Sequence, residues 1–175
     1  SQIPSEGGYE PTIFSDVKML QDRLSSNKNG SITAVETIYV PADDLSDPAV
    51  QMIQRELDST LVLSRRVAEQ GIRPAVDLLR TSSSLLSPEI VGARHYSLSL
   101  QVQAILQKYE SLRTIISIIG ESELSLRDKK DYNRAKDIIQ YFSQRASVTE
   151  DLNGEKGEYY TLEETLSGIE KILKD

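Results

Sequence analysis

Apolar residues recur at helical spacing through most of the second half of the chain. Within residues 91–120 they fall three or four positions apart, which predicts one long amphipathic helix. Residues 122–144 and 161–175 repeat this spacing. Each of these two stretches has near its start a hydroxyl side chain followed three residues later by an acid, a helix-capping pattern: Ser125 with Asp128, and Thr161 with Glu164. The second half therefore predicts a helical bundle.

The first half mixes short helical and extended stretches. Residues 13–24 carry apolar side chains at helical spacing, and "RRVAEQG" predicts a short helix that ends at Gly71. Extended segments are predicted at residues 32–40, 59–64 and 72–76. A serine-rich stretch, 82–88, has the composition of a hinge. The pattern predicts an α/β part followed by an all-α part, divided into residues 1–84 and 85–175.

Composition and charge exclude several kinds of site. The chain has 175 residues, of which 38% are apolar and 27% charged, as in a folded protein of one domain or two small ones. It has no cysteine and one histidine, His95, which excludes disulfides, thiolate chemistry and histidine metal clusters. A net charge of −7 without clustered lysine and arginine argues against nucleic-acid binding. We see no membrane-spanning run and no signal peptide.

Candidate chemistry within the residues themselves is sparse. There is no phosphate-binding loop of the form G-x-x-x-x-G-K-[ST], so this chain has no complete nucleoside triphosphatase site. We expect His95 to have a structural hydrogen-bonding role and the hydroxyls of residues 81–84 to belong to a linker. Asp43, Asp44 and Asp47 follow an apolar stretch but lack the glycine and terminal glutamate of an EF-hand. They predict a solvated or protein-contacting turn, and we expect no metal site.

Several stretches, in one order and spacing, resemble the catalytic β subunit of the F-type ATP synthase. They are "GSITAVETIYVPADDLSDP", "LDSTLVLSR", "GIRPAVD", "SPEIVGARHY", "ILQKYESLRTIISIIG" and "SELSLRD". The resemblance implies the C-terminal part of a P-loop-type nucleotide-binding domain, followed by a helical domain that acts as a lever. It also implies that the phosphate loop, the general base and the magnesium ligands lie upstream of Ser1. ATP or ADP with Mg²⁺ would be bound by the full subunit, and not tightly by this chain alone.

The resemblance assigns roles around the acidic turn. Tyr39 would lie beside the catalytic phosphate site. Asp44, Ser46 and Asp47 would face the central stalk, where exposed ion pairs are weak enough to form and break during rotation. For Asp47 a second interpretation stays open, because an aspartate directly before Pro48 is also a typical N-cap of a helix.

The family's acidic helix-start motif matches the beginning of the stretch 122–144. Glu123, Ser125 and Asp128 fall in this motif and would have a lever or regulatory role. Other acids of the motif are replaced here by Ser122, Leu126 and Arg127. The replacements remove most of the negative charge that the family carries at this place.

Four residues fall at the family's adenine-pocket positions, and each departs from its pattern: Arg73, Ala146, Thr149 and Leu152. The tyrosine and both phenylalanines of the family are missing. Aromatic stacking on adenine, worth about 0.5–1.5 kcal/mol per ring beyond buried area, is therefore lost. Arg73 offers a cation–π contact instead, and it resembles the arginine of the non-catalytic α subunit at this place.

The implied function is that of the C-terminal portion of a rotary ATP synthase or ATPase β subunit, enzymatic only within the assembled proton-transporting complex. Its partners would be α subunits in an alternating hexameric ring and the central γ stalk. The complex would hold it, without insertion, on the cytoplasmic, inner face of a membrane. Two alternatives stay open: a non-catalytic β-like ring or scaffold subunit, and a helical interaction module that binds a basic partner through its acidic surface.

Overall fold

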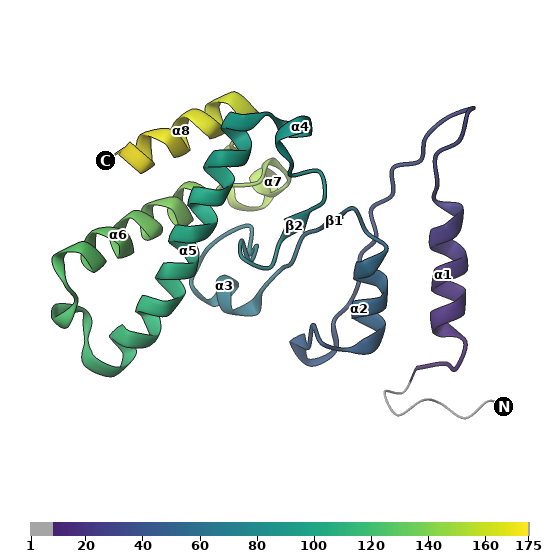
Figure 1. Cartoon of the computed structure of the whole chain (residues 1–175), viewed down its shortest axis with the longest axis horizontal. Coiled ribbons are helices and arrows are strands. Elements are labelled where there is room, and N and C mark those ends of the chain that lie inside the picture. Colours follow the sequence, from purple (N-terminus) through teal and green to yellow (C-terminus); the bar gives the residue numbers. More distant parts are fainter. Residues whose placement is uncertain (1–8, 175) are drawn as a thin grey trace. The chain divides into compact units, whose positions relative to one another are not determined.

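The structure, a computed structural model, describes residues 9–174, and helices form most of its regular structure (Figure 1). The chain divides into two units, one ending at Asp58 and one beginning at Ser59. The first unit contains α1 (Ile13–Arg23), a 3₁₀ turn (Pro41–Asp43) and α2 (Pro48–Arg55). The second contains β1 (Ser59–Thr60), α3 (Arg65–Glu69), β2 (Ser82–Ser83), α4 (Pro88–Val91), α5 (Ala93–Ile119), α6 (Leu126–Tyr141), α7 (Glu150–Asn153), α8 (Leu162–Lys174) and 3₁₀ turns at Glu121–Glu123 and Ser147–Thr149.

In the first unit, α1 packs against α2. The Nζ atom of Lys18, on α1, lies 2.8 Å from a carboxylate oxygen of Glu56 at the end of α2 and 3.1 Å from one of Asp22. These bonds, that to Glu56 foremost, raise the pKa of Lys18. α2 buries Ala49 and Val50, so the apolar contribution to this unit comes mainly from one turn of one helix.

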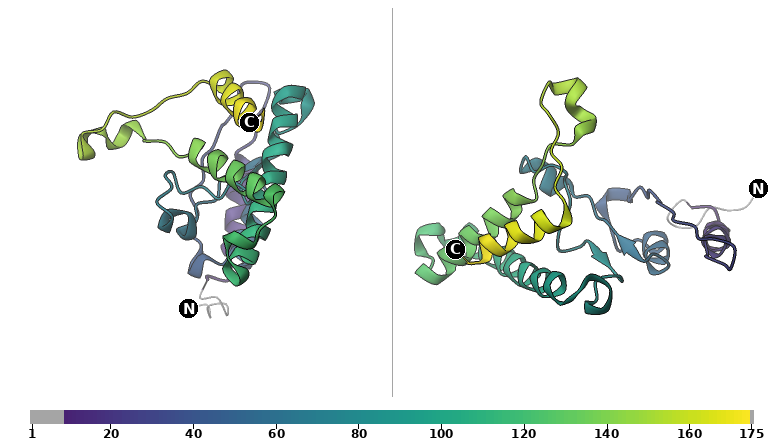
Figure 2. Two further views of the ribbon diagram at one scale, coloured as in Figure 1. Left: turned by 90° about the vertical axis from the view of Figure 1, so that its left-hand side faces the viewer. Right: turned by 90° about the horizontal axis from the view of Figure 1, so that it is seen from above.

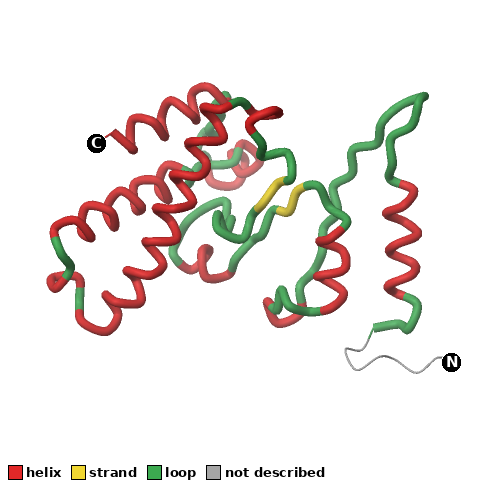
Figure 3. The backbone as a smooth tube through the Cα atoms, viewed as in Figure 1, coloured by secondary structure: helices red, strands yellow, loops and turns green. Residues whose placement is uncertain are grey.

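The predicted strand over residues 32–40 is wrong. The segment is an irregular, extended loop after a turn closed by backbone hydrogen bonds between Asn27 and Gly30 (Figure 3). Val35 is 93% exposed. A strand needs a neighbouring strand to pair with its backbone N–H and C=O groups, and the described residues of the first unit provide none. The apolar alternation alone therefore did not fix the structure of this segment.

Ser82 and Ser83, the first two residues of the serine-rich stretch, are paired in a small sheet, whereas the role of the stretch as a hinge stays a prediction. β1 and β2 run antiparallel, with Ser59 opposite Ser83, and the two hydroxyl oxygens of this pair lie 2.7 Å apart. Thr81 extends the connection, because its hydroxyl oxygen accepts a hydrogen bond of 3.1 Å from the backbone N–H of Val62. Serine and threonine hydroxyls can bond across a pair of strands, and they are also common in exposed linkers. Composition alone therefore did not distinguish a strand from a linker here.

Of the other local predictions in this part, the short helix is confirmed, and the extended segments are confirmed only in part. α3 is the short helix expected from "RRVAEQG", and Gly71 follows its end with a φ of 77°, a conformation that glycine adopts without strain. Of the predicted extended segments, 59–64 is paired at Ser59–Thr60 and at Leu63, which forms an antiparallel bridge with Val76, whereas the backbone of 72–76 bends at residues 73–74. The chain thus returns beside the residues that precede α3.

The second unit is organised around α5, α6 and α8, which lie beside one another (Figures 1 and 2). Their facing sides form one apolar core, contributed by all three helices: Leu98, Val102, Leu106, Ile138, Leu166 and Ile169. Both predicted caps are present. Ser125 accepts from the backbone N–H of Asp128 at 3.1 Å, and Thr161 and Glu164 bond each other's backbone N–H groups at 2.8 and 3.2 Å. The helical second half is therefore confirmed.

Ionic contacts connect the same helices at the surface. Arg94 on α5 lies 2.7 Å from Glu163 and 2.8 Å from Glu170, both on α8. Lys108, also on α5, bonds Asp128 and Asp131 on α6. Each bonded pair joins two helices that the apolar core already brings together, and so fixes their register along one another.

Two further expectations from the sequence concern the hydrogen bonding of His95 and membrane-spanning segments. The Nδ1 atom of His95 is buried without a hydrogen-bond partner among the described residues, so the predicted hydrogen-bonding role does not hold for that nitrogen. No helix within residues 9–174 combines the length and apolarity needed to cross a bilayer.

Gly168 lets α8 approach the end of α6, and replacing it should destabilise the second unit. A Cβ atom at this position would collide with the ring and hydroxyl of Tyr141. We expect Gly168→Ala to lower the free energy of unfolding by about 1–2 kcal/mol, because overpacking outweighs the gain in helix propensity. Urea unfolding measures this. Gly30→Ala is the matched control, since its Cβ would meet nothing within 4 Å; equal effects of the two would contradict the close approach.

Arg94 should make the α5–α8 contact sensitive to acid. Hydrogen bonds to Arg94 lower the pKa of Glu163 and Glu170 below their ordinary value of 4.5. A lowered carboxyl pKa stabilises the fold above the ordinary value and loses that effect as the pH falls through the folded pKa. Arg94→Gln should therefore move both pKa values back upward and flatten the fall of Tm below pH 4.5. Carboxyl NMR titration and melting curves test this, with Lys171→Gln as the control for loss of one charge.

Candidate functional site

The acidic turn of the first unit is ordered by its own side chains. Asp44 accepts hydrogen bonds from both the hydroxyl and the backbone N–H of Ser46, the latter at 2.9 Å, and these lower the pKa of Asp44, the hydroxyl bond foremost. Ala42 and Asp43 adopt φ values of 53° and 58°, in the left-handed region that is uncommon for residues other than glycine. The local bonds hold a sharp reversal in which both Asp43 and Asp44 are exposed residues.

Asp47 has the position of a helix cap. Its Oδ1 accepts from the backbone N–H groups of Ala49 at 2.9 Å and Val50 at 3.2 Å, and its Oδ2 accepts from the hydroxyl of Tyr9 at 3.1 Å. Both carboxylate oxygens are therefore engaged within the first unit. The capping interpretation of Asp47 is confirmed, whereas the stalk contact of Asp44, Ser46 and Asp47 stays a prediction.

Tyr39 lies just before this turn, in the extended loop. Its side chain is 85% exposed. The aromatic ring is thus free of packing in the described part of the first unit, and its position beside a phosphate site stays a prediction. Such an exposed side chain is compatible with a role in completing a site formed by another segment.

Arg73 joins two stretches that are 70 residues apart in sequence. Its backbone carbonyl accepts from the N–H of Gln144 at 2.8 Å and from the hydroxyl of Ser143 at 3.2 Å. Its guanidinium donates to the carbonyl groups of Ala68 at 2.8 Å and Ile72 at 3.0 Å. Arg73 therefore lies beside the end of α6, and the other adenine-pocket positions follow α6 closely in the sequence. The guanidinium of Arg73, however, is bonded to carbonyl groups of its own segment.

Ala146, Thr149 and Leu152 lie on a hairpin that projects from the second unit (Figure 2). The hydroxyl of Thr149 donates to the carbonyl of Ala146 at 2.8 Å, and Leu152 is 87% exposed. Arg145 closes the base of the hairpin through contacts of 3.3 Å with each of Glu155 and Glu158. The structure thus brings Arg73 near the base of this hairpin and leaves Leu152 at its outer part; the nucleotide roles of all four positions stay predictions.

The turn between α5 and α6 carries the remaining predicted residues. Ser125 caps α6, and its hydroxyl also donates to Asp128 at 2.7 Å. This bond and that to Lys108 lower the pKa of Asp128. Glu123 ends the 3₁₀ turn before the cap and is exposed. Ser125 and Asp128 thus act locally to begin α6, and their lever or regulatory role stays a prediction.

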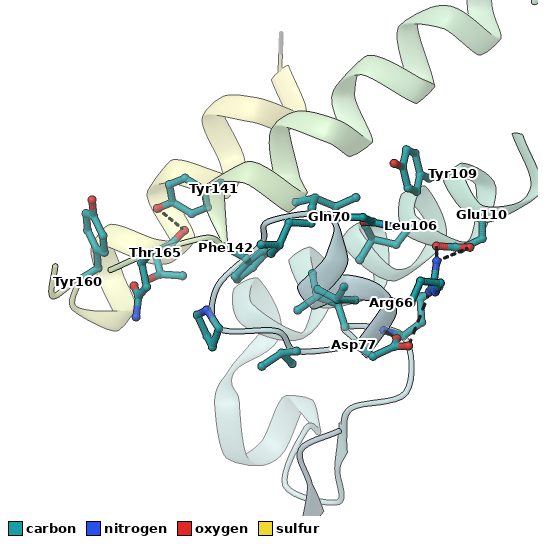
Figure 4. A pocket seen from close by; sticks show the side chains of 18 residues that line it. Arg66, Gln70, Asp77, Leu106, Tyr109, Glu110, Tyr141, Phe142, Tyr160 and Thr165 are labelled. Carbon is teal, nitrogen blue, oxygen red and sulfur yellow. Dashed lines mark hydrogen bonds and ion pairs between the residues drawn. The ribbon is translucent and has the colours of Figure 1, made fainter. Parts of the chain in front are cut away.

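A cavity of about 300 Å³ lies in the second unit (Figure 4). It is surrounded by α3, the segment 72–79, α5, the end of α6 and the beginning of α8. Its walls are mainly apolar, with side chains contributed from α3, the segment 72–79, α5 and the end of α6: Val67, Val76, Leu106, Ile139 and Phe142. Sequence reasoning missed this cavity, because its walls come from segments that are adjacent only after folding.

One end of the cavity carries charged groups. Arg66 donates to both carboxylate oxygens of Glu110, at 3.1 and 3.3 Å, and lies 3.9 Å from Asp77. Asp77 is 8% exposed, and its other oxygen accepts from the backbone N–H groups of Leu79 and Arg80, each at 3.2 Å. An aspartate within the apolar run "PAVDLL" was a sequence signal for such a buried, bonded carboxylate. Within residues 9–174 no group of three or more metal-ligating side chains is placed to hold an ion.

Comparison with known families identifies both parts of the chain. Residues 1–83 match the model of the ATP synthase alpha/beta family, nucleotide-binding domain, and residues 86–172 match the C-terminal domain of V and A type ATP synthase. Both matched models describe domains of ATP synthase subunits, and together they cover nearly the whole chain. The recognition of an ATP synthase subunit and the predicted fold, part of a nucleotide-binding domain followed by a helical domain, are confirmed, whereas the F-type β assignment and the division after residue 84 stay predictions.

A solved structure agrees with this assignment. The chain is similar to "a unique ATP synthase subunit NeqB from Nanoarcheaum equitans", with a TM-score of 0.81 and 25% sequence identity over 99% of this chain. The chain spans 42% of that protein's length. The similarity therefore covers the fold of essentially the whole chain.

Loss of the Asp47 carboxylate should destabilise the first unit more than loss of the Asp44 carboxylate, whose bonds stay within one exposed turn. Asp47→Ala leaves the N–H groups at the start of α2 without an acceptor, for an expected loss of about 1 kcal/mol in the free energy of unfolding. Asp47→Asn retains a good cap and should be close to the parent. Asp44→Ala, on the solvated turn, is the control. Denaturant unfolding followed by circular dichroism distinguishes them; an Asp47→Ala protein as stable as Asp44→Ala would contradict the cap.

Proposed function

We propose that this chain is the C-terminal part of a ring subunit of a rotary ATP synthase, and that its helical domain transmits changes at a nucleotide site to a central stalk. The observation that carries the proposal is the connection at Arg73. Its carbonyl is bonded to Ser143 and Gln144, so the end of the nucleotide-binding portion is tied to the end of α6. A displacement at the nucleotide side would therefore be passed to α6 directly.

The helix pair α5 and α6 supports the lever role. The two helices share the apolar core and are joined by Lys108, which bonds Asp128 and Asp131. Such a pair moves as one body, because relative sliding would break both the packing and the ion pairs. The outer end of the pair, with Glu123, Ser125 and Asp128, would contact the stalk, as would the acidic turn with Asp44 and Ser46.

The nucleotide would be ATP or ADP with Mg²⁺, held mainly by parts of the whole subunit outside this chain. The adenine-pocket positions contribute no aromatic ring, and the Arg73 guanidinium is bonded to two carbonyl groups. We therefore favour a non-catalytic ring subunit that binds nucleotide without rapid turnover. The V and A type C-terminal domain is compatible with this choice. A catalytic F-type β subunit is the second candidate, favoured by the stretches that resemble that family, such as residues 30–48.

The partners would be the other nucleotide-binding subunits of an alternating hexameric ring and the central stalk. In that assembly the chain would be peripheral on the inner face of a membrane. Rotation-coupled synthesis or hydrolysis of ATP would belong to the assembly, and this chain alone would be inactive.

The two candidates differ in their response to an added aromatic ring at the adenine position. In the assembled complex, Arg73→Tyr should tighten Mg-ADP binding about threefold to tenfold through stacking, with kcat for ATP hydrolysis changed less than twofold. Calorimetry and steady-state kinetics measure both. The control is Arg80→Tyr, the same substitution at an exposed arginine outside the adenine positions.

Three other results would change the conclusion. A large change of kcat with Arg73→Tyr would favour the catalytic β subunit. Failure of the subunit to enter a ring with its partner subunits would contradict the proposed function as a whole. The isolated chain should show no Mg-ATP binding below the millimolar range, and micromolar binding would contradict the assignment of the phosphate site to other segments.

A further inference from the structure

The longest helix of the second unit, α5, has an exposed face that carries no charge. Between positions 97 and 119, only serine, threonine, glutamine, alanine, leucine and isoleucine occupy the exposed positions. On α6 and on α8, by contrast, more than half of the exposed residues are charged. Depletion of charged residues is typical of the buried centre of a protein–protein interface. The composition of this face therefore indicates a contact with another protein chain.

The charged residues in this stretch of α5 are bonded within the second unit. Lys108 bonds two aspartates of α6, and Glu110 lies 3.1 Å from Arg66 of α3 and 3.5 Å from Arg113 of its own helix. The residues Lys108, Glu110 and Arg113 are all partly buried beside the rest of the unit. A protein that covers the exposed face would therefore meet no unpaired charge on it.

Most polar side chains of the uncharged face are bonded to α5 itself. The hydroxyls of Ser111, Thr114 and Ser117 donate to backbone carbonyls about one turn earlier, at 3.2, 3.3 and 2.7 Å. The side-chain amide of Gln101 donates to the hydroxyl oxygen of Ser97 at 3.3 Å. Burying a polar group costs much less when its hydrogen bond is retained. Another protein can therefore cover this face without leaving these hydroxyl donors unpaired.

The exposed positions have the spacing of a helix that packs along another helix. Positions 97, 100, 104, 107, 111, 114 and 118 are separated by three and four residues in turn, and all of them are exposed. Such a row stays on one side of a helix and can interlock with the row of a neighbouring helix. In both views of Figure 2, α5 runs along an edge of the second unit, which leaves this row accessible from outside that unit.

The row is complementary to itself when a second copy of the chain lies antiparallel beside it. With a two-fold axis beside Gln107, Leu100 lies opposite Ile115 of the second copy, and Ala104 lies opposite Ser111. The short side chains of Ala104 and Ser111 allow the two helices to approach closely. Leu100 and Ile115, 46% and 43% exposed, then bury apolar surface against each other. The two Gln107 amides meet at the axis, where each can donate to the other.

We propose that two copies of this chain associate through this row of α5 as an antiparallel, two-fold symmetric helix pair. The chain carries a net charge of −7, so two copies repel one another in most other orientations, and the repulsion is least where the uncharged faces meet. One helix from each copy offers less than the roughly 800 Å² per partner of a standard interface, so the dimer is reversible, with a micromolar dissociation constant. The proposal does not depend on the proposed ring function.

Analytical ultracentrifugation of the full chain tests the dimer, and charges at position 107 test its symmetry. The parent should change from monomer to dimer between about 10 µM and about 1 mM at physiological salt. Gln107→Glu and Gln107→Lys should each weaken self-association about tenfold or more, because like charges meet at the axis. An equimolar mixture of the two variants should associate at least as tightly as the parent, since opposite charges then face one another.

The matched control is Asn133→Lys, which adds the same charge at an exposed amide of α6 and should dimerise like the parent. Circular dichroism verifies that each variant keeps its helix content, which substitution at exposed positions should preserve.

Three results would overturn the proposal: a parent that stays monomeric at about 1 mM, Gln107 variants that dimerise like the parent, or a mixture of the two variants that fails to associate. A dimer that like charges at position 107 disrupt, that opposite charges restore and that Asn133→Lys leaves unchanged would establish it. Neither outcome bears on entry of the subunit into a ring, so this test and that of the proposed function can fail separately.

Discussion

The burial of Ile138 between three helices is the contact on which the second unit depends. Its side chain has no exposed surface, and it lies in one cluster with Leu106 of α5 and Ile169 of α8. Full burial of such a side chain contributes roughly 1.5–3 kcal/mol, more than any single exposed ion pair in the unit. The contacts of Arg94 and Lys108 therefore set the register of helices that apolar packing has already brought together.

From this core the geometry of both candidate sites follows. Because α6 is fixed against α5 and α8, its last residues are presented at a defined place, where Ser143 and Gln144 bond the carbonyl of Arg73. The same arrangement brings the segment after α3 opposite the helices and leaves a void lined by Phe142 and Leu106. One bonded junction thus serves the proposed transmission of movement, and the cavity lies beside it.

The two units achieve order by different means. The second relies on apolar packing between long helices, whereas the first has few buried side chains and uses polar bonds at helix ends. Asp47 caps α2 and accepts from Tyr9, and Lys18 joins Glu56 to Asp22. Polar bonds of this kind are directional but individually weak. They order the ends of helices but leave Ile32, Val35 and Tyr39 of the segment between them exposed.

Local sequence signals determined the helices and their ends. Ser125 with Asp128, Thr161 with Glu164, and Asp47 before Pro48 each cap a helix in the structure as the spacing predicted, because a cap involves only residues within one turn. The family too was readable from the sequence, since its motifs recur in one order. These features need no information from distant parts of the chain.

Tertiary structure decided everything that depends on a partner far away in sequence. The alternation at residues 32–40 predicted a strand, but a strand exists only where another pairs with it. The serines at 82–83 became β2 because Ser59 and Thr60 lie opposite them. The cavity, the junction at Arg73 and the need for glycine at position 168 arise from segments that approach only after folding, and no local pattern records which segment a side chain will meet.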